Sequence, residues 1–226
     1  MIRRMTAARF FTQDYLEHTV LPDGTPVRLR LIRPEDKDRL REGFNKLSPA
    51  SRYARFLAPK TSLSDDELRY LCELDNERHL AITAVRDEPP PAEPPGMGIA
   101  RFIRLAEDPT IAEAAIAVAD DAQHRGLGKL LFVRLVAAAA ERGVERFRCE
   151  VLGSNSGMAG LLASISPDRT IEVGGGIMSI ELALPNVTPT RKTDDEPVEG
   201  PMYRLFRAAA QNAVEWTEAV RALWRP

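Results

Sequence analysis

Residues 122–132, AQHRGLGKLLF, are the part of this chain whose residue types and spacing best suit a chemical task. Gly126 and Gly128 stand just before a run of apolar residues with helical spacing. The first N–H groups of a helix have no partner within it, and the helix dipole adds partial positive charge there. Glycines let a bulky anion approach this backbone, and Arg125 and Lys129 add charge. The stretch predicts a diphosphate site; the alternative is a strand-to-helix turn without a ligand.

Two common phosphate-binding motifs do not fit this stretch. A P-loop needs a glycine where the chain has Gln123, and a Ser or Thr where it has Leu130. A dinucleotide fingerprint needs a third glycine where the chain has Leu131, and it normally follows the first strand of a domain. Spacing therefore excludes both motifs.

The elements that must position this loop are predicted from hydrophobic patterning. Ser48 before Pro49 marks one helix start, and Ser64 with Glu67 forms a capping box at another. Strands are predicted at 24–33, 80–86, 96–105, 110–120, 145–152, 170–173 and 176–184, and helices at 35–47, 48–57, 64–74, 129–143 and 155–165. The strand at 110–120 is apolar on both faces, which predicts a central strand covered on both sides. This order predicts an α/β (α+β) fold with a mixed sheet.

Composition and charge limit the possible functions. Lys and Arg number 31 against 33 Asp and Glu, a balance that argues against a nucleic-acid binder. The chain has no apolar run of membrane-spanning length. Cys72 and Cys149 form no metal or disulfide pattern, and the basic start lacks the apolar core of a signal peptide, so we expect a cytoplasmic protein. We expect an N-terminal extension at 1–20, one domain at 21–187, a linker at 188–201 and an amphipathic helix at 202–226.

The loop resembles the acyl-CoA loop of the GNAT N-acetyltransferase superfamily. The pattern Gln123-x-x-Gly126-x-Gly128 lies between AEAAIAVADDA and KLLFVRLV, and Asn155-x-x-Met158 matches the start of the family's next helix. RLIRPEDKDRL and LSPASRYARF are similar to the GNAT domains of bacterial Pat-type protein lysine acetyltransferases. The resemblance covers about residues 24–187. It implies the GNAT fold, with a mostly antiparallel central sheet of about 6–7 strands flanked by helices.

The resemblance also implies acetyl-CoA as cosubstrate, without a metal. The pyrophosphate would lie on backbone N–H groups of the loop, and the pantetheine arm would pair with the strand before it. The residues implied in cofactor binding are Ile116, Val118, Ala119, Gln123, His124, Arg125, Gly126, Leu127, Gly128, Lys129, Asn155 and Met158.

Acetyl transfer to an amine needs a base, because a lysine with a pKa of about 10.4 is mostly charged at pH 7. The family often places a glutamate on the strand before the loop, which makes Glu113 the candidate; the alternative is an exposed carboxylate at the strand's edge. A backbone N–H of the same strand would stabilise the oxyanion. The tyrosine that many relatives carry after Asn155 is absent, so the thiolate leaves unassisted or this half of the site has decayed. Tyr53 is expected as a wall of the acceptor pocket.

We therefore expect an acetyl-CoA-dependent N-acetyltransferase that acts in a ternary complex on a primary amine, either a protein lysine or a small molecule. We expect no nucleic acid or membrane partner, and a monomer or homodimer. The alternatives are a non-catalytic acyl-CoA-binding module, such as a sensor or assembly subunit, and a structural protein that has kept the fold.

Overall fold

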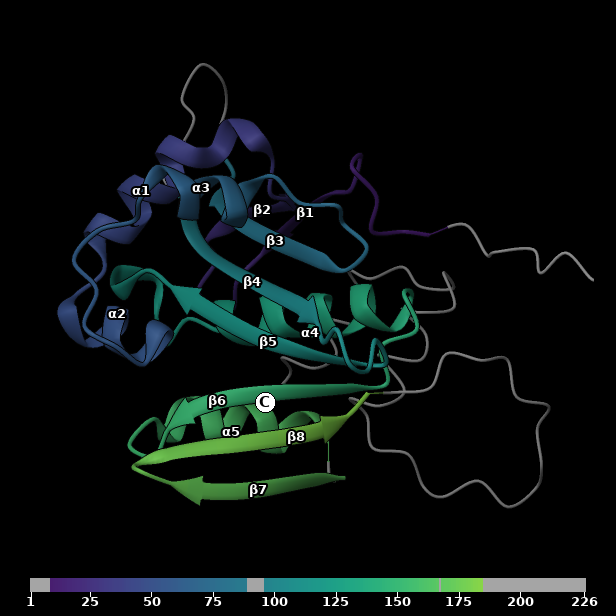
Figure 1. Ribbon diagram of the computed structural model, residues 1–226. Coiled ribbons are helices and arrows are strands. Elements are labelled where there is room, and N and C mark those ends of the chain that lie inside the picture. The colour runs from purple at the N-terminus through teal and green to yellow at the C-terminus, as the bar shows by residue number, and fades with distance from the viewer. Residues whose placement is uncertain (1–8, 89–95, 167, 185–226) are drawn as a thin grey trace, which may run out of the picture.

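The computed structural model describes residues 9–88, 96–166 and 168–184 (Figure 1). The expected linker at 188–201 and helix at 202–226 lie outside these residues. The described residues form an eight-stranded sheet with the order β1-β2-β3-β4-β5-β6-β8-β7, in which only β5 and β6 pair in parallel. The strands are β1 Leu16–Val20, β2 Pro26–Leu31, β3 His79–Arg86, β4 Gly96–Arg104, β5 Ile111–Val118, β6 Arg146–Leu152, β7 Arg169–Gly174 and β8 Ile177–Ala183.

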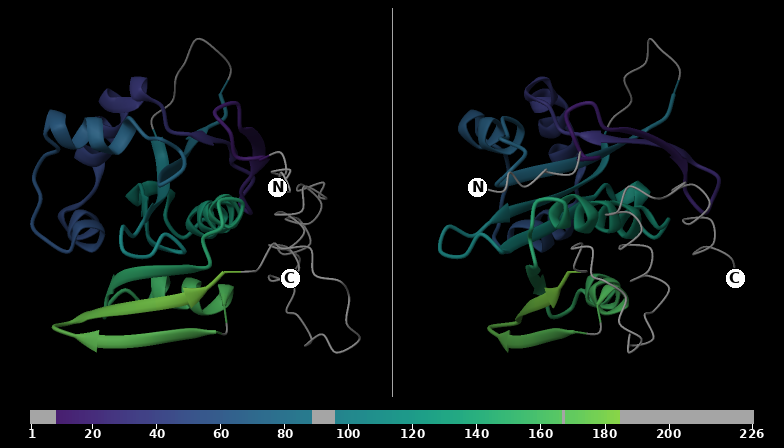
Figure 2. Two further views of the ribbon diagram at one scale, coloured as in Figure 1. Left: turned by 45° about the vertical axis from the view of Figure 1, so that its right-hand side comes forward. Right: turned by 90° about the vertical axis from the view of Figure 1, so that its right-hand side faces the viewer.

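Helices cover both faces of the sheet (Figure 2). Helices α4 and α5 pack on one face, and α1 and α3 on the other. The helices are α1 Lys37–Lys46, α2 Pro49–Phe56, α3 Asp65–Cys72, α4 Leu127–Ala140 and α5 Ser156–Ile165, with short 3-10 turns at Pro34–Asp36 and Asp120–Ala122. The predicted fold class, a mixed and mostly antiparallel sheet flanked by helices, is confirmed.

The sheet has one strand more than the six to seven expected, because β1 forms within the expected N-terminal extension. It pairs with β2, and the preceding Phe11 and Tyr15 are buried in the core. Strand β1, with the sequence LEHTV, lies at the edge of the sheet, where Leu16 and Val20 are 53% and 57% exposed. Because the strand buries little apolar surface, its sequence carries only a weak strand pattern. The extension is thus part of the fold from about residue 9.

The predicted helix starts are confirmed by their caps. Ser48 accepts a hydrogen bond from the Ser51 N–H at 3.2 Å, and Ser64 and Glu67 form the reciprocal capping box of α3. These caps fix where the chain turns from loop to helix, so the start of α2 is firmly placed beside the site described below.

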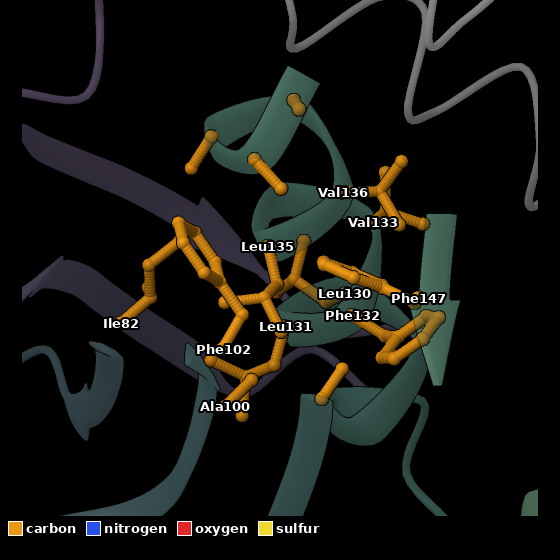
Figure 3. Close-up of a cluster of buried hydrophobic side chains, with 14 of the residues drawn as sticks. Ile82, Ala100, Phe102, Leu130, Leu131, Phe132, Val133, Leu135, Val136 and Phe147 are labelled. Carbon is orange, nitrogen blue, oxygen red and sulfur yellow. The ribbon is translucent and has the colours of Figure 1, made fainter. Parts of the chain in front are cut away.

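The core fixes helix α4 against the sheet. Figure 3 shows its side chains among those of β3, β4 and β6, and the Phe132 and Phe147 rings lie 5.8 Å apart in an edge-to-face arrangement. This helix is buried almost all round. Its first turn is therefore held rigidly at the end of β5.

Strands β5 and β6 separate along their length. Their parallel pairing joins Ile111–Glu113 to Arg146–Arg148 and stops there. Residues 115–118 of β5 are only half-buried, which corrects the expectation that this strand is covered on both faces. The strand is central, as expected, but its second half borders an opening in the sheet.

Candidate functional site

A hollow of about 620 Å³, here called the splay hollow, lies where β5 and β6 separate. Segments of β5, β6, α2, α5 and the loop before α4 line it. The residues that the sequence predicted for cofactor binding and that line this hollow are Ile116, Val118, Gln123, His124, Gly126, Gly128, Lys129, Asn155 and Met158. The fold thus gathers nine of the twelve predicted residues around one space.

The other three predicted residues direct their side chains elsewhere. The Arg125 guanidinium pairs with Asp23 and donates to the Thr25 hydroxyl. The Leu127 side chain is fully buried in the core, and Ala119 lines a second hollow described below. Arg125 and Leu127 can therefore serve an anion through their backbone alone.

The loop before α4 presents a series of backbone N–H groups. His124 and Gly126 have φ angles of 59° and 85°, which turn successive N–H groups toward one side. Within the described part of the chain, the N–H groups of residues 124–128 have no hydrogen-bond acceptor, and the first backbone bond into the helix is Leu130 N–H to the Gly126 carbonyl at 3.0 Å. Such a concave group of donors at a helix N-terminus suits a phosphate.

The open edge of β5 carries further unpaired backbone groups. The Ala119 N–H donates to the Met97 carbonyl of β4 at 2.9 Å. Because backbone groups alternate sides along a strand, those of Ile116 and Val118 face the splay hollow. Gln123 Nε2 donates to the Val118 carbonyl at 3.2 Å, so Gln123 supports this edge. The Ile116 and Val118 N–H groups can pair with an extended ligand or hold an oxyanion.

Asp120 connects the loop to α2, and sequence reasoning missed it. Its carboxylate accepts hydrogen bonds from the Ser48 N–H at 2.6 Å, from the Ser51 hydroxyl, and from Gln123 Nε2 at 3.0 Å. The Ser51 hydroxyl is the main cause of the lowered pKa of Asp120. Two consecutive acidic residues, Asp120 and Asp121, at the end of a predicted apolar strand are the sequence signal that could have indicated it.

A second hollow of about 100 Å³, here called the arginine hollow, lies on the other side of β5 beneath α1 and α2. Its walls are mainly apolar, and four arginines line it: Arg30, Arg39, Arg55 and Arg101. Leu47, Arg55 and Ala117 line both hollows, so the two spaces meet at β5.

Tyr53, the predicted wall of the acceptor pocket, lies on the outer face of α2. It is 44% exposed and lines neither hollow. Arg55, two residues later on the same helix, lines both. Helical residues two apart face different directions. Which of Tyr53 and Arg55 faces the hollows therefore depends on where α2 begins and on which of its faces packs against the sheet.

Glu113, the predicted base, is exposed on β5 at the register position beside Arg148. It alternates with Ala115 and Ala117 on the face that carries α1 and α3, and it is not among the described residues that line the two hollows. Glu150 on β6, which sequence reasoning did not single out, does line the splay hollow. Its position after the buried Cys149 in the predicted strand was the available signal.

The described residues hold no group of three or more His, Cys, Asp and Glu side chains suited to a metal ion. None of their helices is long and apolar enough to span a membrane. Cys72 and Cys149 are free and buried, and burial raises the pKa of Cys149 to about 12, so this thiol stays protonated at neutral pH.

Comparison with known proteins agrees with this geometry. Residues 40–164, more than half of the chain, match the model of the Acetyltransferase (GNAT) family. Acetyltransferase PA5475 of Pseudomonas aeruginosa is 32% identical over 159 residues, which cover 68% of this chain and 84% of that protein. Acetyltransferase Pat of Mycolicibacterium smegmatis is 30% identical over 216 residues, covering 94% of this chain and 60% of the longer Pat.

A solved structure shares the fold as well as the sequence pattern. The GNAT domain of S. lividans PAT matches with a TM-score of 0.66 and 28% identity, over 75% of this chain and 97% of that domain. The resemblance predicted from the glycine loop is thereby confirmed. The chain belongs to the GNAT family of acetyltransferases.

Proposed function

We propose that this protein is an acetyl-CoA-dependent N-acetyltransferase that transfers the acetyl group directly to a primary amine in a ternary complex. The observation that carries the proposal is the meeting of the two hollows at Ala117, beside the unpaired edge of β5. One hollow offers N–H groups for a diphosphate and the other offers space for an acceptor. A single strand separates the two ligands.

In this mechanism the N–H groups of residues 124–128 hold the pyrophosphate of acetyl-CoA, and its extended arm runs along β5. The amine nitrogen attacks the thioester carbonyl, and an N–H of Ile116 or Val118 stabilises the oxyanion. The C–N bond forms, the C–S bond breaks, and the amine's surplus proton passes to a carboxylate through water. Glu113 and Glu150 are the candidate carboxylates on this face of β5 and β6.

The alternative is a non-catalytic acyl-CoA-binding module. Among the described residues no tyrosine lines the splay hollow, so no phenol stands ready to protonate the leaving thiolate. A thiolate is a moderate base and can leave without that help. The missing tyrosine therefore favours the alternative only if turnover is absent.

Two measurements on the full chain separate these functions. Calorimetric titration with acetyl-CoA tests the splay hollow, and release of free thiol in the presence of a panel of amines tests transfer. The enzyme predicts both binding and amine-dependent thiol release. Binding without release for every amine would favour the non-catalytic module, and absence of binding would reject both.

A further inference from the structure

The four arginines around the arginine hollow fall into two pairs with different surroundings. Arg30 donates from both terminal nitrogens to the Asp36 carboxylate at 2.6 Å each, and Arg39 donates to it at 3.2 Å. Burial raises the pKa of Asp36, but hydrogen bonds from Arg30 and the Arg33 N–H outweigh it and lower the pKa. The first pair thus shares one ionised carboxylate.

Within the described residues, the hydrogen-bond partners of Arg101 are neutral groups. Its side chain comes from β4, the residue is 4% exposed, Nη1 lies 3.0 Å from His79 Nε2, and Nη2 donates to the Leu71 carbonyl at 3.3 Å. Burial, followed by the charge of Arg101, lowers the pKa of His79 to about 4. His79 is therefore neutral at pH 7 and accepts a hydrogen bond without balancing the charge of Arg101.

Arg55 reaches the hollow from α2, with its guanidinium 5.0 Å from the centre of the Phe56 ring. Burial lowers the pKa of Arg55, and burial followed by the charge of Arg55 lowers that of Arg101. In the described ranges, no carboxylate pairs with either arginine. The one carboxylate that lines the hollow in the described residues, that of Asp36, is taken up by Arg30 and Arg39. Two like charges without a paired acid are costly for the folded protein, and such arrangements concentrate at functional sites.

The second pair also lies where an acceptor has to be held. Arg101 stands opposite Ala115 in the β4–β5 register, and Arg55 and Ala117 line both hollows. A group held between Arg55 and Arg101 would leave the rest of its molecule beside the unpaired edge of β5. Planar guanidinium groups match carboxylates closely in shape and hydrogen bonding.

We infer that the arginine hollow binds the carboxylate of the acceptor, which is a small amino acid-like amine with an acid group and an apolar body. The inference rests on the proposed function, since it assigns the acceptor of that transfer. The apolar walls include Leu40, Phe44 and Leu63. A volume of about 100 Å³ is on the scale of the ~150 Å³ cavity that accommodates benzene, which suits a small molecule.

The test compares acceptors that have the same side chain but carry either a charged carboxylate or a neutral amide. Thiol release from acetyl-CoA is measured with each of the twenty L-amino acids and with its amide. A hydrogen bond to a charged group contributes about 1.5–3 kcal/mol, so the preferred amino acid should exceed its amide roughly 10- to 150-fold in kcat/KM. The amine of the amide is less basic and is more often unprotonated at neutral pH. Basicity alone would therefore make the amide the faster substrate, which is the opposite of the expected result. Equal rates for acids and amides would overturn the inference.

Substitutions then assign the preference to the two arginines. Arg55→Met and Arg101→Met remove the charge while keeping much of the side-chain volume. Each should bring the acid-to-amide ratio close to one. Arg101→Met should also leave the affinity for acetyl-CoA unchanged, because Arg101 does not line the splay hollow. If Arg101→Met does not fold, the half-buried Arg55 provides the test. Arg41→Met is the control, because Arg41 lies on α1 and pairs with Asp38 and Asp65. If the acid-to-amide ratio of kcat/KM stayed at the wild-type value in both Arg55→Met and Arg101→Met, the inference would be contradicted.

A binding measurement separates this inference from the proposed function. CoA-saturated protein is titrated with the N-acetyl form of each amino acid and with the corresponding amide. Binding of the acid that needs both arginines, without thiol release from any amine, would support the carboxylate site and reject the transferase. Thiol release with neutral amines alone, unaffected by the variants, would keep the transferase and reject the carboxylate site.

Discussion

The splay hollow and the arginine hollow share Ala117 but are built in different ways. The splay hollow offers a ligand unpaired backbone groups, namely the N–H groups of residues 124–128 and the open edge of β5, beside the side chains that also line it. The arginine hollow presents side chains from β2, β4, α1 and α2. Backbone groups are fixed by the fold, whereas side chains change with each substitution. Under the proposed function, the first hollow would hold the constant ligand and the second would determine the acceptor.

Removal of Glu113, one of the two candidate bases, should give the largest effect and tests the acceptor side. Glu113→Gln should lower kcat about 10²- to 10⁴-fold, because the amine would lose its proton acceptor, with an unchanged dissociation constant for acetyl-CoA. Steady-state kinetics and calorimetry measure the two quantities.

Glu150→Gln is the matched variant on β6. A loss of turnover in this variant, with normal turnover in Glu113→Gln, would move the role to Glu150. Normal turnover in both variants would mean that neither carboxylate is needed. The acceptor side would then differ less from the splay hollow in its dependence on side chains.

Asp36→Asn tests whether the arginine hollow is held together by charge. Loss of this buried acid leaves Arg30 unpaired and should lower the free energy of unfolding at pH 7 by about 3 kcal/mol. The pKa of Asp36 in the folded protein lies below its ordinary value of 3.8, so its contribution is present above about pH 4 and is lost as the pH falls through the folded-state value.

Denaturant titrations of the wild type and of Asp36→Asn at pH 7 and near pH 3 measure this effect. The difference between the two proteins should shrink at the lower pH. A difference that is the same at both pH values would show that the carboxylate acts through packing rather than charge.

Gly128→Ala tests the backbone character of the splay hollow. An added Cβ would lie 3.7 Å from a Val118 methyl, an ordinary contact, so the midpoint of thermal unfolding should not fall. The methyl group would face the ligand instead and weaken the acetyl-CoA complex roughly 10- to 150-fold through lost charge-assisted hydrogen bonds.

Gly160→Ala in α5 is the control, because open space surrounds its added Cβ. Calorimetry should give this variant the wild-type affinity. Normal acetyl-CoA binding by Gly128→Ala would count against the loop as the diphosphate site.

Arg125→Met should give the smallest effect. Its guanidinium pairs with Asp23, and partly exposed ion pairs contribute about 0–1 kcal/mol, so stability should change little. The dissociation constant for acetyl-CoA should stay within about threefold of the wild type. A tenfold loss would show that the loop also depends on its charged side chains, which would remove the contrast between the two hollows.

The glycine loop and the helix starts could be predicted from sequence because their signals are local. Gly126, Gly128 and the caps at Ser48 and Ser64 each act within a few residues of chain, and the structure places them as the patterns indicate. The edge strand β1 escaped prediction because few of its side chains are buried, so its pairing with β2 determines its structure.

The acceptor side could not be predicted in the same way. Arg55 and Arg101 are far apart in the sequence, and each looks like an ordinary charged residue in a helix or strand. What distinguishes them is that neither has a carboxylate partner among the described residues. That feature depends on how α2 packs over the sheet and not on the local sequence. Glu113 and Glu150 raise the same difficulty, since strand alternation gives their face but not their distance from a ligand.

The Asp120 carboxylate has a consequence for the order in which ligands bind. It joins the start of α2 to Gln123, so the helix that carries Arg55 and the loop that faces the splay hollow share one support. Ordering of this support by one ligand reduces the entropy that the other must lose, and the coupling is equal in both directions. Double-reciprocal initial-rate lines should therefore converge above the abscissa, which is the sign that each ligand strengthens binding of the other, and Asp120→Asn should move the crossing point toward the abscissa.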